Sequence, residues 1–251
     1  MQETYAVQYP NFEKNHWWFR ARRHILREQL HALAWPPHPT ILEIGVGPGE
    51  NLYSLYPDGA ALVGIEPDPA LAALARSRGA IPIYEATAEE LPESLPDASF
   101  DAVTLFDLLE HTKDDLLVLE RVRQKLAPGG YLVISVPAFM FLWGQQDVVN
   151  LHYRRYTRKE VVSKLQQTGY AVMRATYFNT LLFPPVTTFR ILHRILKKPH
   201  DKPDTDFKYS LGPLNGLLYH IFRSEKWLLR FMNFPVGTSV LVVARKREDG
   251  D

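Results

Sequence analysis

The chain of 251 residues contains no cysteine, and its formal net charge is only +1. The absence of cysteine excludes disulfide bonds and thiolate zinc sites, and it agrees with a cytoplasmic protein. A charge so close to zero gives no reason to expect a nucleic acid as partner. No apolar run reaches the roughly 20 residues of a membrane-spanning helix, and residues 1–4 do not begin a signal peptide. Composition therefore predicts a soluble globular protein without a disulfide framework.

Short apolar segments alternate with helical segments along most of the chain. The predicted strands are residues 40–44, 61–66, 81–84, 100–106, 131–136, 172–177 and 239–244. A helix is predicted over residues 11–35, and later helices begin at Asp68-Pro69 and at the capping box formed by Thr157 and Glu160. This alternation predicts an α/β fold with a mostly parallel sheet and helices on both faces.

A glycine-rich turn directly follows the first predicted strand. Gly45, Gly47 and Gly49 allow the backbone to bend sharply and to approach a ligand, because they have no Cβ atom. Their spacing is G-x-G-x-G, whereas dinucleotide-binding proteins have G-x-G-x-x-G. The acidic Glu43 precedes the turn. An acid at this place favours a ligand that presents a cation over one that presents a pyrophosphate.

The segment 40–52 resembles motif I of the class I S-adenosylmethionine (SAM)-dependent methyltransferases. The resemblance covers residues 40–177 and the last strand, with further matches at Ser99–Val103, Leu109–His111 and Arg121–Gly130. It implies a Rossmann-like sheet of seven strands in the order 3-2-1-4-5-7-6, with the last strand antiparallel. It also implies SAM as cofactor, S-adenosylhomocysteine as product, and a small-molecule methyltransferase of the type 11/12-like kind.

The resemblance divides the chain into three parts. Residues 1–38 are expected to form an N-terminal helical lid, and residues 39–177 with 237–246 to form the SAM-binding core. Residues 178–236 stand where the family needs only a short hairpin, and their many large apolar side chains are expected to be buried. We expect this helical insertion to cover the acceptor site, to extend the core or form a homodimer interface, or to contact a membrane surface through residues 186–198.

Several residues near the predicted strand ends are candidates for cofactor binding. Glu66 ends the second strand, where an acid can accept both hydroxyl groups of an adenosine ribose. Pro67 would then lie beside the adenine, and the resemblance assigns Glu43 to the ammonium group of the methionine moiety. Thr87 stands where the family often has an acid that reads the adenine amino group. We therefore expect a weaker contact from Thr87, together with the backbone of Ala88.

The sulfonium end of the cofactor has candidates in two distant segments. Asp107 follows the fourth strand, where the family lines this end, and the alternative is a helix N-cap. His111 is expected to be structural rather than catalytic. In the segment His16–Arg23, Trp18 suits a sulfonium by cation–π attraction, and Arg22 suits the methionine carboxylate. The alternative is an amphipathic helix that packs its tryptophans on the domain edge.

The acceptor site is predicted in the loop that follows the fifth strand, residues 136–156. Methyl transfer is an in-line displacement, so the protein must align the acceptor and often remove its proton. His152 and Asp147 are the candidate bases, and a pair between them would fix the histidine tautomer. Arg154 and Arg155 would hold an acidic acceptor or lie in solvent, and the alternative is that His152 and both arginines are loop or capping groups. No metal is expected, because the Asp/Asp/Asn ligand set of metal-dependent O-methyltransferases cannot be assembled.

The sequence thus predicts a SAM-dependent methyltransferase that acts on a small-molecule or carrier-linked metabolite. One alternative keeps the fold but not the reaction, for example aminopropyl transfer, although the basic loop after the fifth strand disfavours a polyamine substrate. The other is a methyltransferase-like nucleic-acid-binding module. Residues 106–109 lack the Asn-Pro-Pro-Tyr signature of base-amino methylases, which disfavours that alternative.

Overall fold

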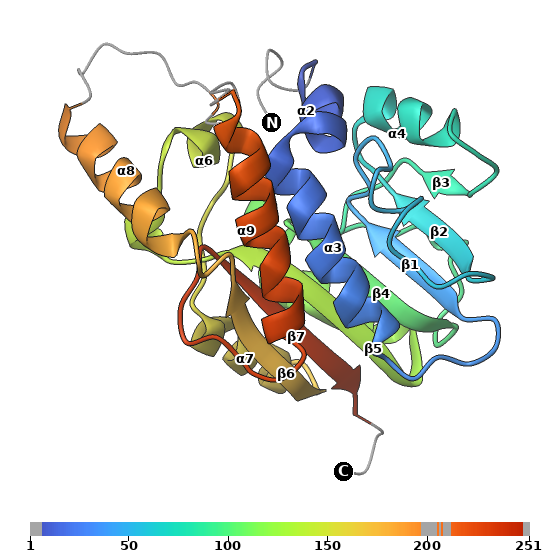
Figure 1. Ribbon diagram of the computed structural model, residues 1–251. Coiled ribbons are helices and arrows are strands. Elements are labelled where there is room, and N and C mark those ends of the chain that lie inside the picture. Colours follow the sequence, from blue (N-terminus) through green and yellow to red (C-terminus); the bar gives the residue numbers. More distant parts are fainter. Residues whose placement is uncertain (1–6, 197–204, 206, 208–211, 248–251) are drawn as a thin grey trace.

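The computed structural model describes residues 7–196, 205, 207 and 212–247. Its strands form one seven-stranded sheet in the order β3-β2-β1-β4-β5-β7-β6 (Figure 1), as predicted. β7 (Ser239–Lys246) is antiparallel to both β5 (Leu126–Pro137) and β6 (Tyr170–Phe178), and the remaining pairs are parallel. The other strands are β1 (Thr40–Ile44), β2 (Ala61–Ile65), β3 (Ile83–Tyr84) and β4 (Phe100–Phe106).

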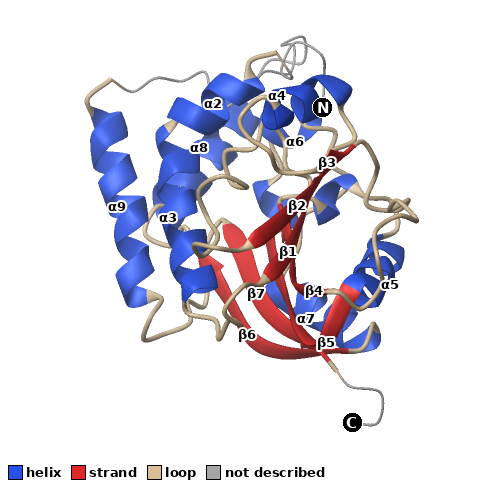
Figure 2. Cartoon of the chain, turned by 90° about the vertical axis from the view of Figure 1, so that its right-hand side faces the viewer, coloured by secondary structure: helices blue, strands red, loops and turns tan. Residues whose placement is uncertain are grey.

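Helices cover both faces of the sheet, as predicted. α3 (Trp17–His31) and α9 (Leu214–Leu228) lie on one face, and α5 (Asp115–Lys125) and α7 (Arg158–Gln167) lie on the other (Figure 2). The shorter elements are α4 (Pro69–Arg76), α6 (Gln145–Val149) and the 3-10 helices η1 (Leu109–His111) and η2 (Met140–Leu142). The central strands are buried on both sides, which explains why they are nearly continuous apolar runs. Because β1, β2 and β4 are parallel, their carboxyl ends lie at the same edge of the sheet, where a ligand site is expected.

The predicted N-terminal helix is divided into α2 (Tyr9–Asn15) and α3. His16 separates the two helices because its backbone is extended (φ −69°, ψ 135°). Its imidazole accepts a hydrogen bond from the amide of Trp18 (3.2 Å) and so caps α3. The break turns α2 away from α3 and allows it to lie above the glycine-rich loop (Figure 1).

The segment between β6 and β7 contains α8 (Phe183–Leu196) and α9. α9 packs along α3 (Figure 1), and its Phe222 is fully buried. A set of these apolar side chains keeps 44–89% exposure and does not extend the core, namely Phe189, Ile191, Leu192, Leu217, Trp227 and Phe231. Their burial against an acceptor, a second copy of the chain or a membrane stays a prediction. Among the described residues, no helix has the length and apolar character to cross a membrane. Residues 197 and 198 of the expected membrane contact lie outside the described residues.

Candidate active site

The glycine-rich loop has the conformation and the close contacts that glycine permits. Gly45, Gly47 and Gly49 have φ angles of 82°, 54° and 88°, in the left-handed region that disfavours other residues. The amide of Gly45 donates to the carbonyl of Ile65 at the end of β2 (2.8 Å). A Cβ atom at Gly45 would lie 3.0 Å from Cδ1 of Leu108. The loop therefore packs directly on the segment that follows β4.

Glu66 is attached to this loop. Its carboxylate accepts hydrogen bonds from the amides of Gly47 (2.8 Å) and Asp68 (3.0 Å), and its side chain is 6% exposed. Burial raises the pKa of Glu66, while the two amide hydrogen bonds oppose that rise. These bonds fix the orientation of the carboxylate at the carboxyl end of β2, the place expected for a ribose-binding acid.

Two further carboxyl groups lie beside the loop and are almost completely buried. Glu43 on β1 accepts a hydrogen bond from the hydroxyl of Tyr56 (2.7 Å) on one oxygen, and its Oε1 has no hydrogen-bond partner within the described part of the chain. Oε2 of Glu13 on α2 is also without such a partner. It lies 3.7 Å from where a Cβ atom of Gly47 would stand. Burial raises the pKa of both carboxyl groups to about 8.

Glu13 is not among the site residues predicted from the sequence. In the sequence, Glu13 stands out only as an acidic residue in a segment otherwise rich in aromatic and basic residues, three positions before His16. Unpartnered buried oxygens are rare in native structures, and they suit a ligand that supplies hydrogen-bond donors.

Arg22 and Asp107 are brought together across the edge of the sheet. Nη2 of Arg22 lies 2.9 Å from Oδ2 of Asp107 and donates to the hydroxyl of Ser135 on β5 (2.9 Å). The same hydroxyl donates to Oδ1 of Asp107 (3.2 Å). The guanidinium also lies over the ring of Trp18, at 5.5 Å. The N-cap alternative for Asp107 is wrong, because the N-cap of η1 is Leu108 and its cap has no side-chain hydrogen bond.

The residues expected at the adenine lie after β2 and β3. Pro67 and Thr87 are exposed, and Ala88 is buried. The hydroxyl of Thr87 accepts a hydrogen bond from the amide of Glu90 (3.1 Å). Thr87 is thus already engaged in a local turn, which weakens the case for a direct contact between its side chain and adenine.

Asp147 is the centre of a buried ion-pair network in the loop after β5. Its side chain is fully buried, and it accepts hydrogen bonds from Nε (2.7 Å) and Nη2 (2.9 Å) of Arg155 and from the amide of Gly144 (2.7 Å). Nδ1 of His152 lies 2.9 Å from its Oδ1. Burial alone would raise the pKa of Asp147, but the bonds from His152 and Arg155 hold it below its usual range. A carboxylate bound in this way is suited to orienting His152 rather than to taking a proton.

The two neighbouring arginines agree with the alternative of loop or capping groups. Arg155 is 7% exposed and forms a two-point ion pair with Asp147, so it neither lies in solvent nor holds an acceptor. Arg154 donates to the carbonyl of Lys113 (2.7 Å) and lies 3.3 Å from a carboxylate oxygen of Asp115. Both guanidinium groups fix the loop to the rest of the fold.

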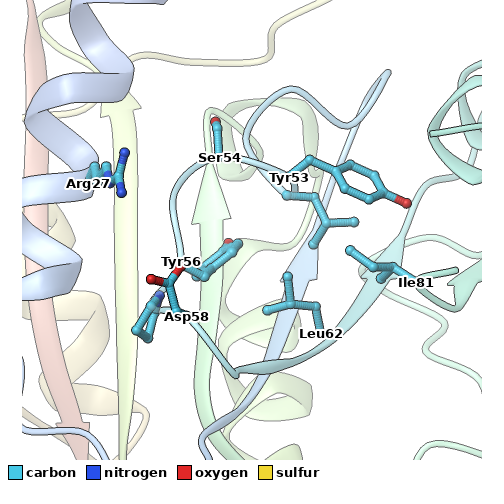
Figure 3. A pocket seen from close by; sticks show the side chains of 9 residues that line it. Arg27, Tyr53, Ser54, Tyr56, Asp58, Leu62 and Ile81 are labelled. Atoms are coloured by element: carbon cyan, nitrogen blue, oxygen red, sulfur yellow. The ribbon is translucent and has the colours of Figure 1, made fainter. Parts of the chain in front are cut away.

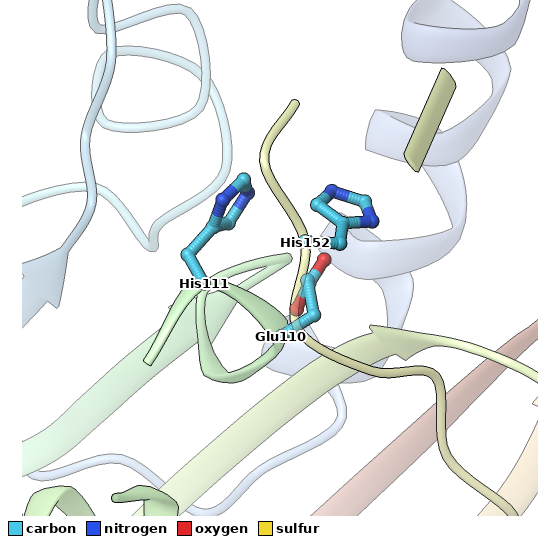
Figure 4. A group of neighbouring side chains, drawn as sticks. All are labelled: Glu110, His111 and His152. Atoms are coloured by element: carbon cyan, nitrogen blue, oxygen red, sulfur yellow. The ribbon is translucent and has the colours of Figure 1, made fainter. Parts of the chain in front are cut away.

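A cluster not predicted from the sequence lies beside this network. Glu110, His111 and His152 each place one potential ligand atom within 4.8 Å of the others (Figure 4). The rings of His111 and His152 are 4.6 Å apart and nearly perpendicular. Burial, followed by the charge of His152, lowers the pKa of His111 to about 3. Glu110 and His111 belong to the segment Leu109–His111 that carries the family resemblance, and only the fold adds His152.

Comparison with known proteins decides the family. A family model described as “Methyltransferase domain” matches residues 18–175. The chain belongs to this family. The prediction of a class I SAM-dependent methyltransferase of the type 11/12-like kind is confirmed, and SAM is the cofactor of this family.

Three curated relatives show the range of activities among similar proteins. A protein of Mycolicibacterium smegmatis named “Probable S-adenosylmethionine-dependent methyltransferase” is 28% identical over 166 residues, which are 65% of this chain and 63% of the relative. A ubiquinone biosynthesis O-methyltransferase of Pseudomonas paraeruginosa is 33% identical over 38% of this chain and 43% of its own. A tRNA U34 carboxymethyltransferase of Shewanella denitrificans is 31% identical over 55% of this chain and 40% of its own. Each match spans less than two thirds of the relative.

Solved structures support the fold of this methyltransferase. A chain in the structure described as “Complex between the Haloferax volcanii Trm112 methyltransferase activator and the putative methyltransferase” has a TM-score of 0.66 and 15% sequence identity, with 99% of both chains covered. At this identity the likeness shows the fold alone.

One pocket of the methyltransferase lies away from the predicted site. Its volume is about 420 Å³, and Arg27, Tyr56, Leu62 and Ile81 are among its lining residues (Figure 3). Leu62 is near the amino end of β2, whereas the glycine-rich loop and Glu66 are at the carboxyl ends of the strands. No predicted site residue lines this pocket.

Proposed function

We propose that this methyltransferase transfers a methyl group from SAM to a small-molecule or carrier-linked acceptor. The observation that carries the proposal is the position of Glu66, whose carboxylate is fixed by the amides of Gly47 and Asp68 at the end of β2. A ribose bound there places the methionine moiety over the glycine-rich loop. The unpartnered oxygens of Glu43 and Glu13 then receive its ammonium group.

The reaction requires an acceptor aligned with the C–S bond of the cofactor. A lone pair of the acceptor attacks the methyl carbon while the bonding electrons of the C–S bond pass to sulfur, so that S-adenosylhomocysteine leaves as a neutral thioether. An acceptor that carries a proton must also lose it. His152 is the group that we place beside the acceptor, and Asp147 orients it through Nδ1. Asp147 itself acts as a positioning residue.

α8 is proposed to form the outer wall of the acceptor site. Arg190 of α8 donates to the carbonyl of Leu142 and lies 3.5 Å from an oxygen of Asp147. Phe183 at the start of α8 packs on Phe139, with ring centroids 6.0 Å apart. These contacts join the helix to the loop that carries His152. The exposed apolar side chains of α8 suit an apolar or lipid-linked acceptor, whereas a homodimer or a membrane contact remains the alternative use of this surface.

A nucleic acid is the alternative acceptor, because one relative acts on tRNA. The net charge of +1 supports the small-molecule proposal over this alternative. A cytoplasmic location stays a prediction from composition.

Two experiments test the proposal. Titration calorimetry with SAM and with S-adenosylhomocysteine should show binding of one molecule per chain, and no binding of NADH. Transfer from methyl-labelled SAM should then be assayed against fractionated extract and, separately, against total tRNA. Label in a small-molecule or lipid fraction is the expected result. Label in tRNA would show that the acceptor is a nucleic acid and not a small molecule. Binding of NADH together with a lack of SAM binding would refute the function.

A further inference from the structure

Glu110 is an unusual residue for the interior of a protein. Its side chain is fully buried, and neither of its carboxylate oxygens has a hydrogen-bond partner among the described residues. A buried carboxyl group in this state either stays protonated or ionises with a cation or a hydrogen-bond donor beside it. The imidazoles of His111 and His152 lie close enough to bind the same cation, and the carboxylate points toward them in Figure 4.

The backbone holds the three side chains together. The amide of Tyr153 donates to the carbonyl of Glu110 (2.8 Å), and the amide of His152 donates to the carbonyl of Asp147 (2.9 Å). The hydroxyl of Tyr156 donates to the carbonyl of Leu109 (3.1 Å). The loop after β5 is therefore attached to η1 at several points, so the cluster is preorganised before any ligand binds.

The surroundings of His152 match those of metal-binding histidines. Its Nδ1 is paired with Asp147, which leaves Nε2 as the nitrogen available to a ligand. A carboxylate that accepts a hydrogen bond from one imidazole nitrogen fixes the tautomer and makes the other nitrogen a better metal ligand. Asp147 is in turn held by Arg155.

We propose that Glu110, His111 and His152 bind one divalent transition-metal ion, such as Zn²⁺ or Mn²⁺. Two imidazole nitrogens and one carboxylate oxygen suit these ions and leave coordination positions open. This set differs from the Asp/Asp/Asn set whose absence led to the expectation of no metal. The cluster adjoins Leu108, which packs on Gly45 of the cofactor loop.

The position of the ion gives it a role in the reaction, and this role rests on the proposed function. An acceptor oxygen at an open coordination position would lie next to the cofactor loop and would lose its proton more readily. The methyl carbon would then form its new bond to that oxygen as the C–S bond breaks, and the proton would pass to solvent. His152 acts as a ligand in this state and not as the general base.

The test is metal binding to the full chain after treatment with a chelator. Mn²⁺ binding is measured by the loss of the free-ion electron paramagnetic resonance signal, and Zn²⁺ binding by calorimetry. Wild-type protein should bind one ion per chain and unfold at a higher temperature with the ion than without it. Glu110→Gln and His152→Asn should weaken binding by at least about tenfold. His38→Asn, which changes an exposed histidine outside the cluster, should bind as the wild type does.

Glu110→Gln keeps the shape of the side chain and replaces one uncharged polar group of the metal-free protein by another, so the metal-free variant should fold. The proposal is overturned if the wild type binds neither ion at millimolar concentration, or if Glu110→Gln and His152→Asn bind as tightly as it does. SAM binding is measured on the same samples. SAM binding without metal binding refutes only the metal site, and metal binding without SAM binding refutes the proposed function.

Discussion

Nη2 of Arg22 lies 2.9 Å from Oδ2 of Asp107, and this ion pair joins helix α3 to the residue that follows β4. The Arg22 side chain is 3% exposed, whereas that of Asp107 is 28% exposed. The guanidinium is thus enclosed, whereas the carboxylate stays partly exposed at the predicted cofactor edge. The pair holds the N-terminal helices in place over that edge.

Replacing Arg22 with methionine should destabilise the protein. The change leaves Asp107 without its cationic partner while it keeps most of the apolar packing of the side chain. We expect the free energy of unfolding to fall by roughly 2–4 kcal/mol, measured by urea denaturation. Arg27→Met changes an exposed arginine on the same helix and should shift the free energy of unfolding by less than about 0.5 kcal/mol. Equal effects of the two variants would contradict a structural role for the ion pair.

Glu66→Ala should weaken SAM binding without changing the fold of the sheet. The variant loses the charge-assisted hydrogen bonds proposed for the ribose hydroxyl groups, so we expect a loss of roughly 1.5–3 kcal/mol in binding free energy by calorimetry. Glu85→Ala is the matched control, because Glu85 is an exposed acid after β3 that pairs with Arg76. Unchanged affinity in Glu66→Ala would remove this carboxylate from the cofactor site.

His152→Ala should lower turnover about 10²-fold or more with nearly unchanged SAM affinity. We expect this loss because His152 is paired with Asp147 in the predicted acceptor loop, and it holds whether His152 acts as a base or as a metal ligand. Initial rates with saturating SAM and calorimetry on the same preparation separate the two effects. His31→Ala, at the exposed end of α3, should retain full activity. Wild-type turnover in His152→Ala would make this histidine a structural residue.

The free energy of unfolding should fall as the pH rises from about 5 to 8 in SAM-free protein. Burial raises the pKa of Glu43 and Glu13 from 4.5 to about 8, so between these values each is protonated when folded and ionised when unfolded. Unfolding then releases protons, and each group contributes a slope of at most roughly 1.4 kcal/mol per pH unit. Glu43→Gln should make the slope shallower in urea denaturation, and Glu85→Gln should not. An identical slope in Glu43→Gln would mean that Glu43 is ionised in the folded chain.

Polar substitution on α8 should impair acceptor use selectively. Leu192 is 51% exposed, so Leu192→Ser removes little from the core. If α8 forms the acceptor wall, kcat/KM for the acceptor should fall while SAM affinity and thermal stability stay as in the wild type. Leu74→Ser on α4, where the side chain is 40% exposed, is the matched control. A drop in vesicle binding or in dimer content, at unchanged kcat/KM, would favour the membrane or the homodimer alternative.

The sequence by itself determined the features that depend on neighbouring residues. β1 and β4 have their predicted bounds because buried parallel strands need continuous apolar runs. The capping box of Thr157 and Glu160 begins α7 as predicted, since its hydrogen bonds join residues only three positions apart. The left-handed glycines of the loop follow from local backbone sterics in the same way.

Only the tertiary structure decided which distant side chains meet. Ser135 contacts Arg22 across 113 positions of the chain, and no periodic pattern marks such a pair. Glu13 reaches the glycine-rich loop because His16 breaks the predicted helix, and His152 reaches Glu110 because the loop after β5 folds back onto η1. Local sequence fixes strands and turns through short-range sterics and hydrogen bonds. The site arises from the order of the strands, which brings their carboxyl ends, and the loops that follow them, to a single edge.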